Sequence, residues 1–323
     1  MKKLLLLVLI LLMITTVIPY LIIKGLSDYE GNETFMNNEV VSVYIKDENR
    51  ICDMNIEQYI KEVTAAEMPA DFHQEALKAQ AVAARTYLAN RVRVYKNSKI
   101  PDEHNGAMIC TDSAHCKAWT SEEVKKQQWG KDANKNWKKI SDAVDETKNI
   151  IITYEGNPIS AVFHSTSSGF TENAKDVWGG DVKYLVSVKS DGEERSPRFS
   201  SEKELTLEEF KKIAEENIEG VNWDNGMVED IERSEAGGIK TLSLGGVKIK
   251  GTDFRFMYGL RSTNVEVEVV DDVVKMHIKG YGHGVGMSQY GANHLAGEGK
   301  TFAEILKTYY SGVEISKYES LYE

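Results

Sequence analysis

The sequence predicts a fold of the α+β class, with a single extracytoplasmic domain of mixed helices and antiparallel strands behind an N-terminal transmembrane helix. Strand-like and helical stretches follow one another without the regular alternation of a parallel α/β fold. No long linker interrupts the chain after its first 39 residues. The 323 residues are 41% hydrophobic and 28% charged, a composition typical of a globular protein that buries one large core or two modest ones.

The N-terminus has the pattern of a membrane anchor. Lys2 and Lys3 precede an uncharged run over residues 4–23, which Lys24 ends. A helix of that length spans about 30 Å, the thickness of a bilayer core. The alternative is a cleaved signal peptide, although residues 20–26 offer no clean run of small residues for cleavage.

The charges around this run predict its orientation. Basic residues lie before the span and acidic residues follow it, so we expect a cytoplasmic N-terminus and a folded part outside the cell membrane. We therefore divide the chain into a cytoplasmic stub with its anchor (1–27), a tether (28–39) and the folded domain (40–323).

Within the folded domain, periodicity and turn residues predict the order of the elements. The expected elements are a strand at 40–46, helical stretches over 55–95 broken at 68–71, a polar irregular loop over 97–137, a hairpin over 150–164, a helix at 206–216, strands near 241, 247 and 265–278, and two short C-terminal helices, the second begun by a capping box at Thr301 and Glu304.

Glu67 is the candidate catalytic acid. With Ile56, Ile60 and Val63 it lies at spacings that share one helix face, at a position where the pattern calls for an apolar residue. A carboxyl group held against apolar surface has a raised pKa, as a general acid near neutral pH requires. The alternative is a Glu that reaches solvent from the helix end or pairs with Arg85.

The next helix, over residues 73–95, is rich in alanine and carries further candidates. Gln80 and Tyr87 share one face of it, and Arg85 lies beside that face. These three are candidate ligand contacts. They are equally consistent with a buried helix whose polar groups are satisfied internally.

Four metal-ligand side chains fall within thirteen residues of the 97–137 loop: His104, Cys110, His115 and Cys116. Thiolate and imidazole together are the usual ligands of tetrahedral zinc, although this spacing is not a common zinc-finger spacing. Four protein ligands leave no open coordination position, so the zinc would be structural. The rival interpretation is a Cys110–Cys116 disulfide outside the cytoplasm. Cys52 lies far away in sequence, and we expect it in the core.

The net charge of −11 argues against nucleic acid as a partner, because nucleic acid rewards clustered Lys and Arg. It does not argue against a polysaccharide. Two segments that suggest other enzyme classes are incomplete. The serine-rich segment 164–169 lacks the Gly-x-Ser-x-Gly elbow, and the glycine-rich segment 282–291 does not complete a dinucleotide-binding motif.

Four ordered segments carry a resemblance to a known family. They are residues 59–69 (YIKEVTAAEMP) with 75–87 (EALKAQAVAARTY), then 163–169 (FHSTSSG), 258–263 (YGLRST) and 282–292 (GHGVGMSQYGA). This pattern resembles the stage II sporulation protein D family, which also includes the amidase-enhancer proteins. The segment 110–116 resembles a Cys-rich element of many members.

The resemblance implies a lytic transglycosylase that acts during endospore formation and engulfment. Glu67, in the Glu-Met-Pro element, would be its single acid/base. The enzyme would cut between N-acetylmuramic acid and N-acetylglucosamine, preferably in glycan stripped of stem peptides. Ordinary glycosidases need two carboxylates, about 5 Å or about 6.5 to 9.5 Å apart. A transglycosylase uses the sugar's own C6 hydroxyl as nucleophile, so one carboxyl group is enough.

The same resemblance implies partners and a location. The partners would be a cell-wall amidase, stage II sporulation protein P, and the membrane protein stage II sporulation protein M. The location would be the space between the mother-cell and forespore membranes.

If glycan is the substrate, two loops supply further candidate contacts. The polar loop with Ser165 and Ser167 is suited to hydrogen-bonding sugar hydroxyls. In the glycine-rich segment, glycines let backbone approach a bulky ligand, and His283 and Gln289 would touch substrate or orient Glu67. A turn histidine satisfied by backbone is an equal alternative for His283. Trp178 could stack on a sugar ring, although core packing is the commoner fate of such a residue.

Two other functional classes compete with a transglycosylase. One is a glycan-binding protein that activates an amidase without cutting, as the name of the amidase-enhancer members suggests. The other is a zinc-dependent hydrolase, which the apparently complete ligand set disfavours. The position of Glu67 on an apolar helix face distinguishes a transglycosylase from a glycan-binding activator, because a protein that only binds glycan needs no carboxyl group there.

Overall fold

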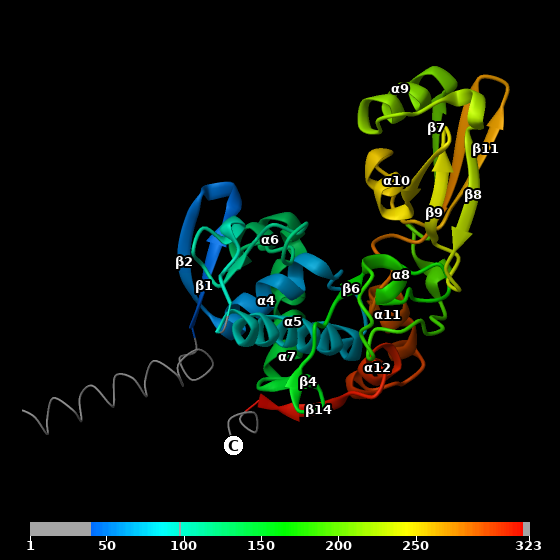
Figure 1. Ribbon diagram of the computed structural model, residues 1–323. Helices are drawn as coiled ribbons and strands as arrows, with labels where there is room; N and C mark the ends of the chain where they lie inside the picture. The colour runs from blue at the N-terminus through cyan, green and yellow to red at the C-terminus, as the bar shows by residue number, and fades with distance from the viewer. Residues whose placement is uncertain (1–39, 97, 319–323) are drawn as a thin grey trace, which may run out of the picture.

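The computed structural model describes residues 40–96 and 98–318 (Figure 1). It has the mixed architecture expected for this chain, with helices and mainly antiparallel strands in one domain. No helix in these described ranges is both long and apolar enough to cross a membrane. The predicted anchor and tether lie outside the described residues.

The long helix α5 (Gln74–Tyr95) runs through the centre of the body (Figure 1). Its alanines at positions 76, 79, 81, 83, 84 and 89 are all buried. Small side chains on several faces let neighbours approach from several directions, because packing distance depends on side-chain size. The elements that pack against α5 include α4 (Ile56–Glu67), α7 (Ala133–Asp145), β4 (Ile150–Tyr154), β5 (Asn157–Pro158), α11 (Gln289–Gly297) and α12 (Phe302–Tyr309).

Helix α4 begins and ends where the sequence predicts. The Asn55 side chain caps its first turn by accepting from the Gln58 N–H. Pro69 follows the extended residue Met68, since a proline disfavours helical backbone in the residue before it. Ile56, Ile60 and Val63 are buried, so the predicted apolar face is confirmed.

Two small sheets flank the helices. One has the order β2-β1-β3, in which β1 pairs antiparallel with β2 and parallel with β3. The other has the order β14-β4-β5 and is antiparallel. The bounds are β1 Val40–Ile45, β2 Arg50–Asn55, β3 Ile109–Cys110, β5 Asn157–Pro158 and β14 Glu314–Lys317.

The interpretation of residues 97–137 as an irregular loop is only partly right. The His/Cys part is loop-like, but α6 (Glu122–Trp129) follows it and α7 begins at Ala133. The Ser121 side chain caps α6 by accepting from the Val124 N–H. No side chain of α6 is fully buried, so the helix needs no apolar stripe, and its sequence gives no amphipathic pattern from which to predict it. Helix α7 does have one, formed by Trp137, Ile140 and Val144.

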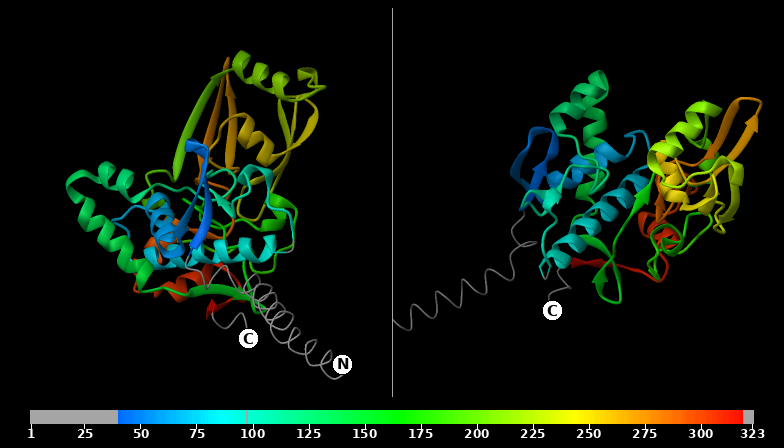
Figure 2. Two further views of the ribbon diagram at one scale, coloured as in Figure 1. Left: turned by 90° about the vertical axis from the view of Figure 1, so that its left-hand side faces the viewer. Right: turned by 45° about the horizontal axis from the view of Figure 1, so that its top comes forward.

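Residues 200–279 form a lobe with its own buried core, separate from the body (Figures 1 and 2). Two three-stranded sheets, β11-β12-β7 and β10-β9-β8, enclose that core with two helices. The bounds are β7 Ser200–Thr206, α9 Leu207–Asn217, β8 Val228–Arg233, β9 Ile239–Leu244, β10 Val247–Lys250, α10 Gly251–Met257, β11 Val265–Val270 and β12 Val273–Lys279.

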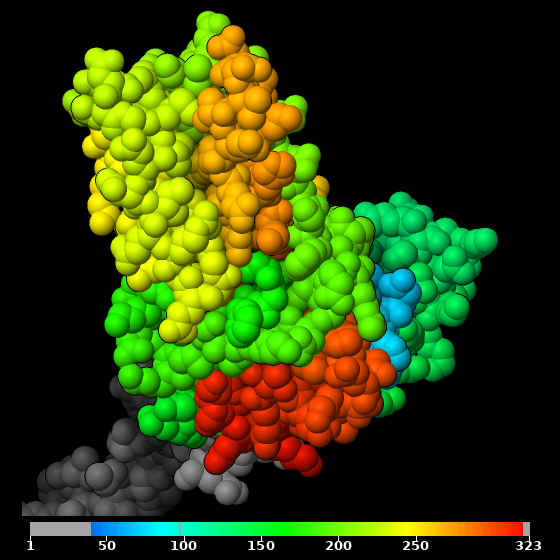
Figure 3. Space-filling model, turned by 90° about the vertical axis from the view of Figure 1, so that its right-hand side faces the viewer, coloured from blue at the N-terminus to red at the C-terminus, as the bar shows by residue number. Residues whose placement is uncertain are grey.

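The chain leaves the body for this lobe after residue 199 and returns at residue 280. Figure 3 shows the lobe on top of the green segment that precedes it in the chain, with the C-terminal part, in red, below that segment. In the body, β6 (Phe163–His164) pairs in parallel with β13 (Met287–Ser288), so the strands before and after the lobe lie side by side. The short helix α8 (Ala174–Trp178) lies where lobe and body meet (Figure 1).

The remaining ordered turns are single 3-10 turns. They are η2 Lys46–Glu48, η3 Asp102–His104, η4 Gly130–Asp132, η5 Glu193–Arg195 and η6 Trp223–Asn225. Thr206 and Thr301 each form a complete capping box, so both predicted starts, of α9 and of α12, are confirmed.

Candidate active site

A cleft of about 840 Å³ opens beside the C-terminal end of α4. Its walls are formed by the end of α4, one face of α5, the segment 113–118, helix α6, strand β6, the loop 281–283, the start of α11 and the edge of the lobe. The side chains that carry its chemistry are Glu67, Tyr87, Arg91, Lys117, Lys125, His164, Ser165, Arg198, Arg255, His283 and Gln289.

Glu67 is the last residue of α4 and lines this cleft, half-buried. The Ala118 N–H donates to its Oε1 at 2.9 Å, and the Gln289 side chain hydrogen-bonds it as well. Burial raises the pKa of Glu67 above its ordinary value, while the Lys117 charge, the Ala118 N–H and Gln289 oppose that rise. Among the described residues, Glu67 is the only carboxyl group that lines the cleft.

Lys117, which sequence reasoning missed, lies next to this acid. Only 8% of it is exposed. Its Nζ lies 3.9 Å from the Phe163 ring centroid and 4.5 Å from that of Tyr87. Burial lowers the pKa of Lys117 to about 8, and the negative charge of Glu67 counteracts this. The only sequence signal for Lys117 is its position directly after Cys116, one of the four predicted metal ligands.

The cleft is basic although the protein is acidic. Five cationic side chains line it, and in the described ranges none of them forms a salt bridge. The five come from α5, the His/Cys loop, α6, the segment before β7 and α10: Arg91, Lys117, Lys125, Arg198 and Arg255. Unpaired cations around a single carboxyl group favour an anionic ligand.

Two histidines of the cleft are neutral. Burial lowers the pKa of His164 to about 4 and that of His283 well below its ordinary value. His164 Nδ1 lies 3.2 Å from the Val285 carbonyl and must donate to it, while His283 Nδ1 accepts from the Val285 N–H at 3.1 Å. Neither imidazole is therefore charged near neutral pH, and Glu67 remains the acid of the cleft.

The glycine-rich loop has a different role from the predicted one. At Gly282, where φ is +117°, a Cβ would lie 2.7 Å from the Cβ of His164. At Gly286, where φ is +74°, it would lie 2.2 Å from the Val162 carbonyl oxygen. These glycines thus allow a left-handed backbone and close contact with the protein's own β6 region, rather than with a ligand.

Of the predicted contact residues, four line the cleft: Tyr87, Ser165, His283 and Gln289. Gln80 does not, because it is fully buried. It lies behind Gln289, whose Nε2 is 3.4 Å from its Oε1. Gln80 therefore supports a cleft residue instead of meeting a ligand.

Arg85 and Ser167 also lie away from the cleft. Arg85 is fully buried and binds Glu57 through two hydrogen bonds of 2.6 and 2.9 Å, so it neither pairs with Glu67 nor reaches a ligand. Ser167, 2% exposed, donates to Glu193 at 3.0 Å. For both, the expected ligand contact has to be corrected to a structural position.

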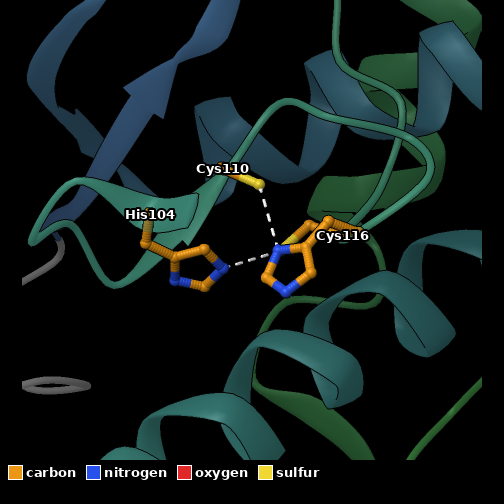
Figure 4. A group of neighbouring side chains, drawn as sticks. His104, Cys110 and Cys116 are labelled. Carbon is orange, nitrogen blue, oxygen red and sulfur yellow. Dashed lines mark hydrogen bonds between the residues drawn. The ribbon is translucent and has the colours of Figure 1, made fainter. Parts of the chain in front are cut away.

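The four predicted metal ligands come together in one cluster. Their ligand atoms all lie within 4.8 Å of one another. His104 Nε2 is 3.1 Å from Cys116 Sγ, and His115 Nδ1 is 3.5 Å from Cys110 Sγ and 3.7 Å from Cys116 Sγ. Figure 4 shows His104, Cys110 and Cys116 pointing toward one another. Cys110 and Cys116 are free thiols in this structure, as is the distant Cys52.

This geometry suits a tetrahedral metal ion. Zinc bonds of about 2.0 Å to nitrogen and 2.3 Å to sulfur place neighbouring ligand atoms about 3.3 to 3.8 Å apart. Three of the six pairwise separations, 3.1, 3.5 and 3.7 Å, are close to that range, and all six lie within 4.8 Å. The Cys110 side chain hydrogen-bonds Cys116 and lowers the pKa of that thiol, which favours the thiolate form that a metal ion binds.

The cluster is built by local pairing and holds one wall of the cleft. Strand β3 pairs with β1, which fixes Cys110 opposite Tyr44, and a turn closed by the Cys116 N–H on the Asp112 carbonyl returns the chain. The next residues, Lys117 and Ala118, are those that face Glu67. Ordering the cluster therefore orders the surroundings of the acid.

The geometry defines a class of site: a polar cleft that contains one carboxylic acid and lies beside a cluster of two thiols and two imidazoles. The family model described as stage II sporulation protein matches residues 44–154, which include Glu67 and the cluster. The chain belongs to the stage II sporulation protein D family, as the following relatives show.

Stage II sporulation protein D of Bacillus subtilis (strain 168) is 38% identical over 291 residues, which cover 89% of this chain and 82% of that protein. The protein of the same name from Bacillus amyloliquefaciens is 37% identical over 297 residues, covering 91% and 84%. A more distant relative is the amidase enhancer of Bacillus subtilis (strain 168), 27% identical over 310 residues that span 80% of this chain and 40% of that protein.

Proposed function

We propose that this protein is a lytic transglycosylase that cuts peptidoglycan glycan strands during endospore formation, between N-acetylmuramic acid and N-acetylglucosamine. The observation that carries the proposal is the single carboxyl group of the cleft, Glu67, whose pKa is raised by burial. A hydrolase of the usual kind would need a second carboxylate across the bond, and the described residues of the cleft supply none.

In this mechanism Glu67 works twice. Protonated, it donates its proton to the glycosidic oxygen as the bond from C1 to that oxygen breaks. The C6 hydroxyl of the same muramic acid residue attacks C1, and the Glu67 carboxylate accepts the hydroxyl proton. The acid is regenerated, a 1,6-anhydro sugar is formed, and no water is consumed.

The neighbours of Glu67 suit both halves of this cycle. Burial, and the partial negative charge at the end of α4, favour the protonated acid before cleavage. Lys117, the Ala118 N–H and Gln289 stabilise the carboxylate that exists between the two proton transfers. The pKa of Glu67 is therefore raised without preventing its ionisation.

The basic lining supports the proposed preference for glycan without stem peptides. Removing the peptide from muramic acid frees the lactyl carboxylate, whereas an attached peptide converts it to a neutral amide. Unpaired cations such as Arg198 and Arg255, on the lobe side of the cleft, favour the free carboxylate. An amidase that removes stem peptides would thus supply the substrate.

A non-catalytic activator is the second candidate, favoured by the name of the amidase-enhancer relative. Such a protein would bind glycan in the same basic cleft and stimulate an amidase. It would have no use for a partly buried carboxyl group among unpaired cationic side chains, which is why we favour the enzyme.

Location and partners follow from the proposed substrate. We propose that residues 4–23 anchor the chain in the cell membrane, with the folded domain facing the space between mother cell and forespore. The family resemblance implies stage II sporulation protein P as the amidase and stage II sporulation protein M as a membrane partner.

We also propose that His104, Cys110, His115 and Cys116 bind a structural zinc ion. With four protein ligands, zinc would supply no open position for chemistry. Its effect would be to hold the segment that presents Lys117 and Ala118 to Glu67.

The Glu67→Gln variant should lose glycan cleavage, by at least about 100-fold, because the amide cannot donate and recover a proton. Release of anhydro-sugars from peptide-free peptidoglycan, followed by mass spectrometry, measures this. Glu62→Gln is the matched control, since Glu62 is a buried carboxyl group on the same helix that bonds Trp119. Wild-type turnover by Glu67→Gln, with both variants folded, would refute the mechanism.

The Arg255→Gln variant should lose discrimination between substrates. On peptide-free glycan its kcat/KM should fall about tenfold, a loss of about 1.4 kcal/mol of charge-assisted hydrogen bonding. On the same glycan with its lactyl groups amidated, wild type and variant should be equal. Lys248→Gln, which removes an exposed charge elsewhere on the lobe, should change neither value. Equal losses on both glycans would assign Arg255 another role.

The purified full-length protein should contain about one zinc ion per chain, because the cluster supplies four protein ligands for a single ion. Elemental analysis with a thiol titration measures this. Cys110→Ser should lose the metal, and Cys52→Ser, which alters a thiol outside the cluster, should keep it. Protein without zinc and without free thiols at 110 and 116 would instead indicate the disulfide.

A further inference from the structure

A second pocket, of about 440 Å³, lies between α8 and the lobe. The short helix contributes Lys175, Asp176 and Trp178, and β9 with α10 contributes the facing wall, including Lys240, Thr241 and Asp253. The mechanism above uses none of these residues.

Trp178 is the unusual member of this set. About 51% of it is exposed, whereas the other four tryptophans, all in the described ranges, are partly or fully buried. A large, half-exposed indole is costly to leave in water unless a ligand covers it. Contrary to the core position that we weighed from the sequence, Trp178 stands at the rim of a pocket.

The second pocket lies close to the catalytic cleft, because one residue of each is in ring contact with the other. The Trp178 ring centroid lies 5.1 Å from that of His283, which lines the cleft on its other side. Glu172, 5% exposed, lines the second pocket and accepts from the Gly238 N–H at 3.1 Å, which fixes the lobe against the α8 segment. A ligand that leaves the cleft past His283 therefore meets Trp178 next.

The chemistry of the lining matches a sugar. An aromatic face suits the apolar C–H face of a pyranose ring. Around it stand side chains that both donate and accept, with Asp176 paired to Lys240 at 3.3 Å and Thr241 beside them. Mixed donors and acceptors suit the ring of hydroxyl and acetamido groups on an N-acetylated sugar better than they suit an apolar peptide.

We propose that this pocket is a distal subsite that binds an N-acetylhexosamine residue of the same glycan strand, away from the bond that is cut. The proposal rests on the proposed function, because it assigns the strand that Glu67 cleaves to both pockets. It makes the protein selective for long strands over short oligosaccharides.

Binding of peptide-free glycan to the full-length Glu67→Gln protein tests the subsite without cleavage. Strands of defined length are compared, tetrasaccharides against strands of sixteen or more sugars. Adding Trp178→Ala should weaken binding of the long strands, roughly three- to tenfold, and leave the tetrasaccharide unchanged. Trp178→Phe should retain most of the binding. Val124→Ala, another exposed apolar side chain that lines neither pocket, should have no effect.

Equal losses for short and long strands would overturn the proposal, since Trp178 would then belong to the cleft itself. No loss for either would overturn it too, as would unchanged glycan binding with lost stimulation of an amidase, which would make the pocket a protein-docking site. Failure of the proposed function is a separate result. Wild-type protein that binds long strands through Trp178 but releases no anhydro-sugars would keep the subsite and reject the enzyme.

Discussion

Two opposing effects act on the carboxyl group of Glu67, and the proposed chemistry depends on their balance. Burial at the end of α4 disfavours the charged form of Glu67, while Lys117, the Ala118 N–H and Gln289 favour it. If burial acted alone, the acid would give up its proton too reluctantly to take part in a cycle. If the cation and hydrogen bonds acted alone, Glu67 would be ionised before substrate arrived.

Much of the fold serves to bring these opposing groups together. The end of α4 supplies the acid, the His/Cys cluster positions residues 117 and 118, and the strand pair β6–β13 carries the chain into α11, where Gln289 begins. The lobe closes the remaining side with Arg198 and Arg255 at its edge. Packing on the alanine-rich helix α5 holds the body elements in place.

Patterns of neighbouring residues in the sequence predicted the helix faces and helix starts of this arrangement. The spacing of Ile56, Ile60, Val63 and Glu67 placed the acid on a buried face, and the capping box at Thr301 located the start of α12. Contacts between residues far apart in the sequence could not be predicted. Arg85 meets Glu57, 28 residues away, and no periodicity marks Lys117 as a neighbour of Glu67. The strands β2, β7 and β8 were missed because their exposed, charged residues lack a clear apolar alternation.

The pKa of Glu67 itself is the most direct test of this account. Infrared difference spectra between wild-type protein and Glu67→Gln, recorded across a pH series, isolate the carboxyl band of that one residue. The account predicts that the protonated band persists above the ordinary glutamate value of about 4.3. Ionisation of Glu67 at or below that value would contradict the claim that burial keeps this group protonated for catalysis.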